Sequence, residues 1–336
     1  MSEPASPTTA VERGAPVRRS PKGGGAVPRR WTLHGLNNGA IFRATYRGVS
    51  FLPRRVSYAI GHVGTWIAWR AMPGTRQALA DNLRALFPDE SERQLERRGL
   101  DTLRAYAQDI IDFLRALKAG DEDTRATFEA RPVDLELFNQ LLARGRGIIL
   151  VTGHYGNWEI GSVFMQRVFK HPLTIVAMAE ADESVNRIRR EIRDRLGTDT
   201  IEVKKSFDTA LQIRRRLAEN GMVAMLMDRY MGRDRTDVDF LGRRAGFLGA
   251  PALMGYVSDA PLLPCFIERL APGRFSIQPG EPIFVPRDRP RDEAIRYATQ
   301  CFASQLEARV RARPHHWYHF YPYWKAQSGS YGDLID

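Results

Sequence analysis

The sequence places a histidine and a carboxylate five positions apart, His154 and Glu159, in the segment Val151-Thr-Gly-His-Tyr-Gly-Asn-Trp-Glu159. On one continuous helix, five residues at about 100° each would turn the two side chains about 140° apart. They can meet only if His154 lies in the turn before a helix and Glu159 lies in its first turns. The carboxylate would then hold one imidazole nitrogen and leave the other as a general base, while helix N–H groups face a developing oxyanion or a phosphate. A histidine that only caps a helix fits the same spacing.

Motifs of several large enzyme classes are absent from the chain. It contains no Gly-x4-Gly-Lys-Ser/Thr phosphate loop, no Gly-x-Ser-x-Gly elbow, no Cys-x2-Cys and no His-Glu-x2-His. Gly145 and Gly147 lack the third glycine of a dinucleotide-binding fingerprint. P-loop NTPases, serine hydrolases of that fold, zinc proteases and NAD enzymes are therefore disfavoured. The two cysteines cannot form a disulfide framework, which favours a reducing compartment.

Strand and helix patterns alternate around the histidine from residue 131 onward. Short apolar runs predict strands at 147–152, 173–177, 200–203, 222–227, 262–267 and 275–277. Amphipathic stretches between them predict helices at 158–169, 185–196, 207–219 and 292–311. The sequence thus predicts an α/β fold in which a mixed sheet is flanked by helices, with 129–325 as the catalytic core.

The region before this core is expected to be helical over 76–128. Leu79, Leu83 and Leu86 recur at helical spacing before Pro88. Ser91 opens a Ser-Glu-Arg-Gln capping box ahead of a helix to about residue 117. Residues 76–325 are therefore expected to form one α/β domain, followed by a tail at 326–336.

Positive charge is concentrated at the N-terminus. The chain has 50 Lys+Arg and 39 Asp+Glu, a formal charge of +11, and residues 1–55 carry 10 of the cations against Glu3 and Glu12. Residues 1–30 hold five prolines and no apolar periodicity or signal-peptide core, so a disordered basic tail is expected. Such a tail suits an anionic membrane, nucleic acid or solvent alone. The rest of the chain is nearly neutral, so the charge alone leaves these alternatives open.

Residues 31–75 have the character of a helical segment at a membrane interface. Apolar side chains share one helical face, with two tryptophans beside it and arginines around it: Val56, Ile60, Val63 and Ile67, with Trp66 and Trp69. A helix that packs on its own domain produces the same pattern. The charge-free stretch 56–69 is shorter than the roughly 20 residues that span a bilayer, so no transmembrane helix is expected.

The segment around His154 resembles the His-x4-Asp/Glu motif of the glycerolipid acyltransferase superfamily. Further stretches resemble its bacterial branch of lipid A late (lauroyl or myristoyl) acyltransferases and phosphatidylinositol mannoside acyltransferases. In chain order they are Asp81-Asn-Leu-Arg-Ala-Leu-Phe-Pro88, the 220–229 run ending in Asp228-Arg229, Val238-Asp-Phe-Leu-Gly242, and Pro251-Ala252 with Ala260-Pro-Leu-Leu-Pro264. The resemblance covers residues 76–325. The aromatic block at 315–324 departs from the branch's usual Trp-x-Trp pattern.

The resemblance implies acyl transfer from an acyl carrier protein or coenzyme A thioester to a hydroxyl of a lipid or glycolipid, with a lipid A precursor favoured. It implies that His154 is the general base and that Glu159 orients it, without a covalent acyl-enzyme, a metal or a bound cofactor. It also implies an enzyme at the cytoplasmic face of the inner membrane. Many members of the branch begin with a spanning helix, but none is expected here, so we expect a peripheral enzyme whose basic tail is a tether to anionic lipids, with no nucleic acid as a partner. A lysophospholipid acceptor is an alternative. A non-catalytic membrane- or nucleic-acid-binding protein is an alternative from another class.

Four more residues are candidates for substrate binding. Asn157 lies beside the histidine, while Asp228 and Arg229 end a predicted strand, where α/β sites usually form. An arginine there can hold phosphate. Arg190 belongs to a basic helix face that suits a lipid head group. Each also has a structural role open to it: a helix cap for Asn157, a salt bridge for the Asp-Arg pair, and a solvated face for Arg190.

The C-terminal aromatic block also contains three histidines. His315, His316 and His319 have a spacing that metal ligands can adopt. Core packing is the commoner reason for such a block, and no metal site is expected.

Overall fold

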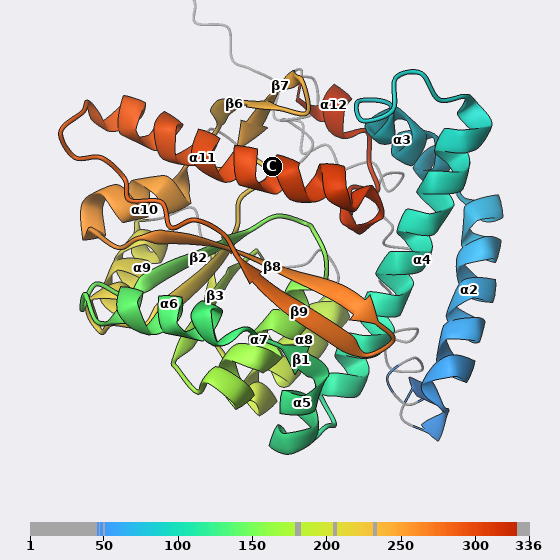
Figure 1. Ribbon diagram of the computed structural model, residues 1–336, viewed down its shortest axis with the longest axis horizontal. Coiled ribbons are helices and arrows are strands. Elements are labelled where there is room, and N and C mark those ends of the chain that lie inside the picture. The colour runs from blue at the N-terminus through green and yellow to red at the C-terminus, as the bar shows by residue number, and fades with distance from the viewer. Residues whose placement is uncertain are drawn as a thin grey trace, which may run out of the picture.

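In the computed structural model, helices cover both faces of a central β-sheet (Figure 1). The structure describes residues 46, 48–49, 51–178, 183–203, 207–230 and 234–327. The tail predicted at 1–30, the first part of the segment 31–75 and nearly all of the tail at 326–336 lie outside these residues.

The described residues form a seven-stranded sheet in the spatial order β1-β9-β8-β2-β5-β3-β4, and a separate hairpin of β6 and β7. Neighbouring strands of the sheet are parallel except β8 and β9, which are antiparallel. The predicted α/β fold with a mixed sheet is confirmed. The strands are β1 Phe128–Glu129, β2 Ile148–Thr152, β3 Leu173–Ala177, β4 Asp199–Glu202, β5 Met222–Leu226, β6 Thr236–Phe240, β7 Arg243–Phe247, β8 Leu262–Ala271 and β9 Arg274–Pro279.

Helices precede, connect and follow these strands. They are α2 Arg54–Ala71, α3 Pro73–Leu83, α4 Glu92–Ala116, α5 Asp121–Thr127, α6 Pro132–Leu142, α7 Trp158–Phe164, α8 Glu183–Leu196, α9 Asp208–Ala218, α10 Ala250–Ser258, α11 Arg291–Ala312 and α12 Tyr323–Ala326, with a π-helical turn η2 at Met165–Phe169 and a 3₁₀ turn η3 at Pro314–His316.

Two apolar cores, one on each face of the sheet, hold the helices in place. Side chains of β2 alternate between them, because successive residues of a strand point to opposite faces. Ile149 and Val151 join the core that contains residues of α9, α10 and α11. Ile148 and Leu150 join the core that contains residues of α4, α6 and α7. The strand that carries the His154 turn is thus buried on both faces.

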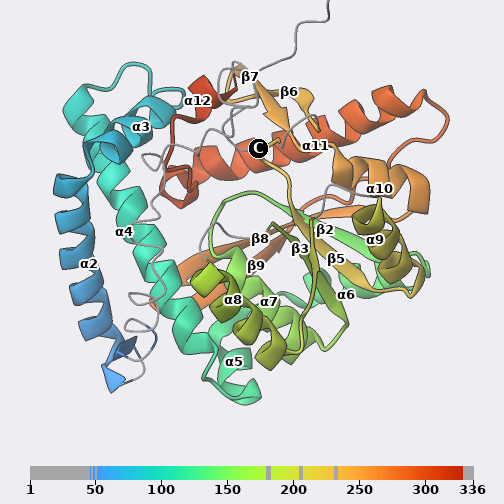
Figure 2. The same ribbon diagram turned by 180° about the vertical axis from the view of Figure 1, so that it is seen from behind.

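The N-terminal helices stand at one side of the sheet. Both views place α2 outermost against α4, on the opposite side of the molecule from α9 (Figure 1, Figure 2). Helix α4 begins after Ser91 as the capping box predicts, and the Ser91 N–H donates to Oε1 of Gln94 at 2.9 Å. Within the described residues, no helix is both long and apolar enough to cross a membrane.

Two local expectations differ from the structure. The helix predicted over 158–169 is interrupted: α7 ends at Phe164, the π-helical turn follows, and Lys170 ends it in the left-handed conformation with φ 55°. The 238–242 stretch, which resembles a loop motif of the branch, forms the end of β6 and its tight turn into β7. There Phe240 is fully buried, with its ring centroid 5.7 Å from that of Trp317.

Candidate active site

His154 and Asp228 meet just beyond the carboxyl ends of two neighbouring strands. In the parallel pair β2 and β5, Thr152 lies opposite Leu226, so the same register carried two residues further brings 154 level with 228. Nδ1 of His154 lies 2.7 Å from Oδ1 of Asp228, and the His154 backbone N–H donates to Oδ2 at 2.8 Å. The sheet therefore joins two residues that are 74 positions apart in the sequence.

The turn between β2 and α7 depends on two glycines. A Cβ at Gly153 would lie 3.0 Å from Oδ2 of Asp228. At Gly156, where φ is 59°, a Cβ would lie 2.1 Å from the carbonyl oxygen of Ile267. Only glycine combines this close backbone approach with a left-handed conformation at no cost. The two glycines let the His154 backbone come within hydrogen-bond distance of the carboxylate.

A C-terminal segment brings a second histidine to Asp228. The N–H of Tyr318 donates to the carbonyl oxygen of His154 at 2.7 Å, next to an antiparallel bridge between the two segments. This pairing sets Nε2 of His319 2.8 Å from Oδ2 of Asp228. The carboxylate, which is fully buried, thus lies between two imidazole rings.

Asn82 fastens this C-terminal segment to the helical N-terminal region. Its Nδ2 donates to the carbonyl oxygens of His319 at 2.9 Å and Tyr321 at 2.8 Å, and its Oδ1 accepts the N–H of Tyr323 at 2.9 Å. Asn82 is buried and belongs to the 81–88 stretch that the sequence analysis singled out. The stretch therefore helps to position the segment that carries His319.

Arg229 fixes the tautomer of His319 and, through it, that of His154. The Arg229 Nε–H donates to Nδ1 of His319 at 3.3 Å, and a guanidinium has no acceptor. Nδ1 of His319 is therefore the acceptor, and Nε2 carries the proton that is donated to Asp228. The two histidines hold the pKa of Asp228 well below its usual range, so the carboxyl is ionised and Nδ1 of His154 also donates to it. The lone pair of His154 is left on Nε2.

Burial and nearby charges set the protonation of this cluster. Burial and the positive charge of Arg229 lower the pKa of His154, although Asp228 opposes the change. The same two causes lower the pKa of His319 to about 3. Burial by itself would raise the pKa of Asp228, but the charges and hydrogen bonds of the two histidines hold it well below its usual range. At neutral pH the cluster contains one carboxylate and two neutral imidazoles, so His154 can accept a proton.

Comparison with known proteins decides the family. Residues 30–326 match the model of the bacterial lipid A biosynthesis acyltransferase family. The chain belongs to this family. It is an acyltransferase, which confirms the branch inferred from the motifs and sets aside the non-catalytic alternative.

Two curated relatives match most of this acyltransferase. The phosphatidylinositol mannoside acyltransferase of Mycolicibacterium smegmatis is 25% identical over 291 residues, which cover 85% of this chain and 90% of the relative. The protein of the same name from Mycobacterium tuberculosis strain H37Rv is 26% identical over 292 residues, which cover 80% and 88%.

The carboxylate at Nδ1 of His154 in this acyltransferase comes from Asp228, where the sequence analysis expected Glu159. Glu159 lies in the first turn of α7, and its orienting role stays a prediction. Asp228 was expected at the substrate, but both of its oxygens bond to histidines. Arg229 bonds to His319 and lies 4.8 Å from the ring centroid of Tyr321, and its role in phosphate binding stays a prediction.

The other two candidates for substrate binding lie on helices. Asn157 caps α7: its Oδ1 accepts the N–H of Ile160 at 3.2 Å, and its Nδ2 donates to the carbonyl oxygen of Asp109 at 2.9 Å. Both ends of the amide are thus engaged inside the protein. Arg190 lies exposed on α8. Substrate binding by either residue stays a prediction.

His154, Asp228 and His319 also present three ligand atoms within 4.8 Å of one another, a separation that a metal ion could bridge. A histidine binds metal through a nitrogen without a proton, whereas Nδ1 of His154 and Nε2 of His319 donate protons to the carboxylate. The donor set as folded therefore fits a hydrogen-bonded relay. The sequence analysis flagged His319 only for its spacing, because nothing local indicates that the chain returns to the end of β5.

Proposed function

We propose that this acyltransferase moves a fatty acyl group from an acyl carrier protein or coenzyme A thioester to a hydroxyl of an anionic glycolipid. Family membership supplies the reaction class. The observation that carries the proposal is the hydrogen bond between Nδ1 of His154 and Asp228, because it leaves Nε2 free to accept the proton of a hydroxyl.

In the proposed reaction, Nε2 of His154 takes the acceptor hydroxyl proton as the hydroxyl oxygen attacks the thioester carbonyl carbon. The tetrahedral intermediate collapses with cleavage of the carbon–sulfur bond, and the imidazolium returns its proton to the leaving thiolate. Asp228 holds the imidazole in the required tautomer and stabilises the imidazolium. The products are an ester and a free thiol, and direct attack by the acceptor hydroxyl forms both without an acyl-enzyme, a metal or a bound cofactor.

His319 and Arg229 support Asp228 from the side opposite His154. The Nε2–H of His319 gives Oδ2 of the buried carboxylate a second donor beside the His154 backbone N–H. Arg229 keeps Nδ1 of His319 occupied, and its charge keeps the pKa of His154 low. The base is therefore unprotonated at neutral pH, before the substrate arrives.

The acceptor is proposed to be a phosphorylated glycolipid with a free sugar hydroxyl. The family name supports a lipid A precursor, which we favour, and the names of the two relatives support a phosphatidylinositol mannoside. Both lipids combine phosphate, sugar hydroxyls and acyl chains. A basic helix face such as that of α8, which carries Arg190, suits the phosphate of either.

Helix α2 supplies the surface for attachment to the membrane. One face of α2 packs on the protein through Tyr58, Ala68 and Trp69, which are buried. The predicted apolar face is the one that points outward, with between 41% and 60% of each side chain exposed: Val56, Ile60, Val63 and Ile67. We name these four residues the α2 stripe. An apolar stripe that no other described element covers suits the boundary between head groups and acyl chains.

We therefore propose peripheral attachment to the cytoplasmic face of the inner membrane, where both types of thioester donor are made. Replacing Ile60 and Val63 by Asp should lower binding to anionic vesicles by on the order of 100-fold, because each change removes an aliphatic side chain that the proposed attachment buries in the bilayer. Val133→Asp is the control, since Val133 is 63% exposed on α6, outside the stripe. Deleting residues 1–55 should also weaken binding. Unchanged binding of the stripe variant would overturn the attachment.

The reaction is tested with full-length protein and defined lipids. Acyl carrier protein and coenzyme A thioesters are each offered with a lipid A precursor, a phosphatidylinositol mannoside or a lysophospholipid. Mass spectrometry should find one acyl chain added to an anionic glycolipid, an equal amount of free thiol, and no acyl adduct on the protein. Transfer only to the lysophospholipid would overturn the glycolipid acceptor. Absence of transfer to every acceptor would overturn the proposed function.

A further inference from the structure

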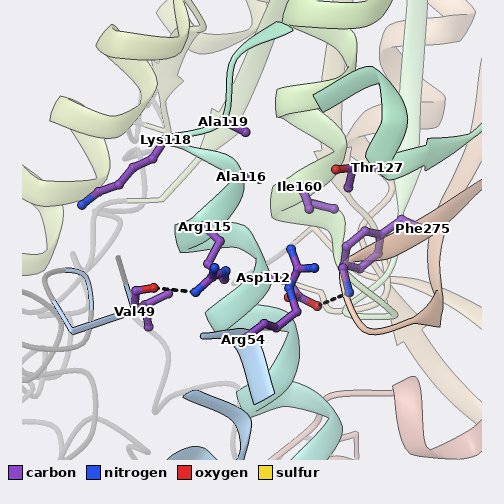
Figure 3. Close-up of a pocket in the computed structure, with 11 residues that line it drawn as sticks. Val49, Arg54, Asp112, Arg115, Ala116, Lys118, Ala119, Thr127, Ile160 and Phe275 are labelled. Carbon is purple, nitrogen blue, oxygen red and sulfur yellow. Dashed lines mark hydrogen bonds and ion pairs between the residues drawn. The ribbon is translucent and has the colours of Figure 1, made fainter. Parts of the chain in front are cut away.

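A cavity of about 240 Å³ lies where α2 begins, between the last turns of α4 and the β8–β9 turn. Figure 3 shows Arg54, Asp112 and Arg115 gathered in it, with Ile160 and Phe275 beside them. None of these side chains takes part in the His154 cluster. The proposed acyl transfer therefore leaves the cavity without a function.

The cavity is positively charged. Three cations line it, Arg54, Arg115 and Lys118, against the single carboxylate of Asp112. That carboxylate has a counterion and two hydrogen-bond donors: Nε of Arg54 lies 3.1 Å from Oδ1 in an ion pair, and Oδ2 accepts the hydroxyl of Tyr58 and the N–H of Gly273. Because Arg54 balances its charge, the lining keeps a net positive charge that suits an anionic ligand.

Arg115 is the residue best placed to receive an anion. Its Nη1 donates to the carbonyl oxygens of Val49 at 2.6 Å and Leu52 at 2.8 Å, which hold the side chain in place. Among the described residues it forms no ion pair with a carboxylate. The guanidinium keeps further N–H donors in a planar fork that matches phosphate. Half-buried and held by its backbone contacts, it is already ordered before a ligand arrives.

The shape of the cavity depends on a glycine. Gly273, with φ 72° in the β8–β9 turn, lies so close to Arg54 that a Cβ there would come within 2.1 Å of the guanidinium carbon. The guanidinium is thus packed flat against the turn, where Nη1 also faces the carbonyl oxygen of Pro272 at 3.4 Å. The cavity also has an apolar part, which is lined by the fully buried side chains of Ile160 and Phe275.

We propose that this cavity binds the phosphate of an anionic membrane lipid, as a docking site separate from the reaction centre. The site lies at the start of α2, where Arg54 stands two positions before Val56, the first residue of the α2 stripe, and the side chain of Phe51, three positions earlier in the sequence, is 87% exposed. An interfacial helix sits just below the level of lipid phosphates, so a cationic cavity at its end meets them. The inference rests on the membrane attachment proposed above and is independent of acyl transfer.

The test compares two arginines at the same end of the molecule. Full-length wild type, Arg115→Gln and Arg55→Gln are titrated with phosphatidylcholine vesicles with and without phosphatidylglycerol. Arg55 is exposed and next to Arg54 in sequence, but does not line the cavity. Arg115→Gln should weaken binding to the anionic vesicles about tenfold, and Arg55→Gln at most about fivefold, the effect of one surface charge. Arg115→Lys keeps the charge and should retain more binding than Arg115→Gln.

Two further measurements distinguish a docking site from diffuse attraction between charges. Gly273→Ala, which leaves Arg115 unchanged and displaces Arg54, should also weaken binding to anionic vesicles. Dihexanoyl phosphatidylglycerol in solution should bind wild type more tightly than inorganic phosphate does. If Arg115→Gln and Arg55→Gln weakened binding to anionic vesicles equally, diffuse attraction between charges would explain the binding and the proposal would be overturned. Equal affinity of wild type for dihexanoyl phosphatidylglycerol and inorganic phosphate would also overturn it. Because no readout involves acyl transfer, a failed transfer assay leaves this result intact.

Discussion

Asp228→Asn removes the charge of the central carboxylate and keeps the size and shape of the side chain. In the folded protein Asp228 accepts three N–H donors: the ring and backbone N–H groups of His154 and Nε2–H of His319. An asparagine offers one acceptor oxygen and one NH₂ group in the same space. The NH₂ group cannot accept a hydrogen bond from an N–H group. Either His154 therefore changes tautomer and carries its proton on Nε2, or a buried N–H donor loses its acceptor.

The expected loss of activity follows from these contacts. A lost charge-assisted hydrogen bond is worth about 1.5–3 kcal/mol. The wrong tautomer removes the base as well, and the corresponding change in a Ser-His-Asp triad lowers kcat about 10⁴-fold. We therefore expect kcat to fall by a factor on the order of 10³–10⁴, which is about 4–5.5 kcal/mol in the barrier. KM should change little, because the carboxylate is buried behind the histidine.

The assay is steady-state acyl transfer with Asp234→Asn as the matched control. Oδ1 of Asp234 accepts the N–H of Gly249 at 2.8 Å and Oδ2 accepts that of Ala250 at 3.0 Å, so asparagine keeps one of these bonds and loses the other, the same kind of change outside the His154 cluster. The control should stay within about twofold of wild type. Far-ultraviolet circular dichroism establishes that both variants are folded. A folded Asp228→Asn protein with kcat within tenfold of wild type would refute the assignment of Asp228 as the partner of the base.

Three more changes test the surroundings of the pair. Arg229→Gln removes a charge that lowers the pKa of His154, so this pKa should rise and the acid limb of the kcat/KM profile should move to higher pH; a shift to lower pH would contradict the electrostatics. Gly153→Ala brings a Cβ to 3.0 Å from Oδ2 of Asp228 and should lower kcat by about tenfold, with urea unfolding as the check that the fold survives. Asn82→Ala removes three hydrogen bonds to the C-terminal segment and should lower the free energy of unfolding by about 3 kcal/mol. Urea unfolding should show a lower midpoint at constant m-value, and an unchanged midpoint would rule out the anchoring role of Asn82.

Local features of the site could be predicted from the sequence. The strand before His154 is a short β-branched run, the two glycines predict a turn, and Asn157 begins a helix, as observed. These features depend on residues within a few positions of one another. The outward face of α2 also followed from helical spacing, although spacing alone could not tell which face packs on the protein.

The partners of His154 could not be predicted in this way, because they depend on strand order and chain return. Asp228 meets the histidine only because β5 lies next to β2 in the sheet, in matching register. Strands β3 and β4 come between β2 and β5 in the sequence but lie beyond β5 in the sheet. His319 reaches the carboxylate only because the C-terminal segment pairs with the turn after β2. A carboxylate directly after a predicted central strand was the available signal, since such strand ends gather at one edge of an α/β sheet.

One pair of substitutions tests whether His154 is the base for acyl transfer. Acyl transfer to membrane lipid extract is measured for wild type, His154→Ala and His171→Ala. His171 is the control because its Nε2 lies 2.9 Å from the carbonyl oxygen of Asn220, outside the cluster. We predict a loss for His154→Ala of at least about 10³-fold, with His171→Ala close to wild type. If folded His154→Ala protein were as active as wild type, His154 would not be the base for acyl transfer.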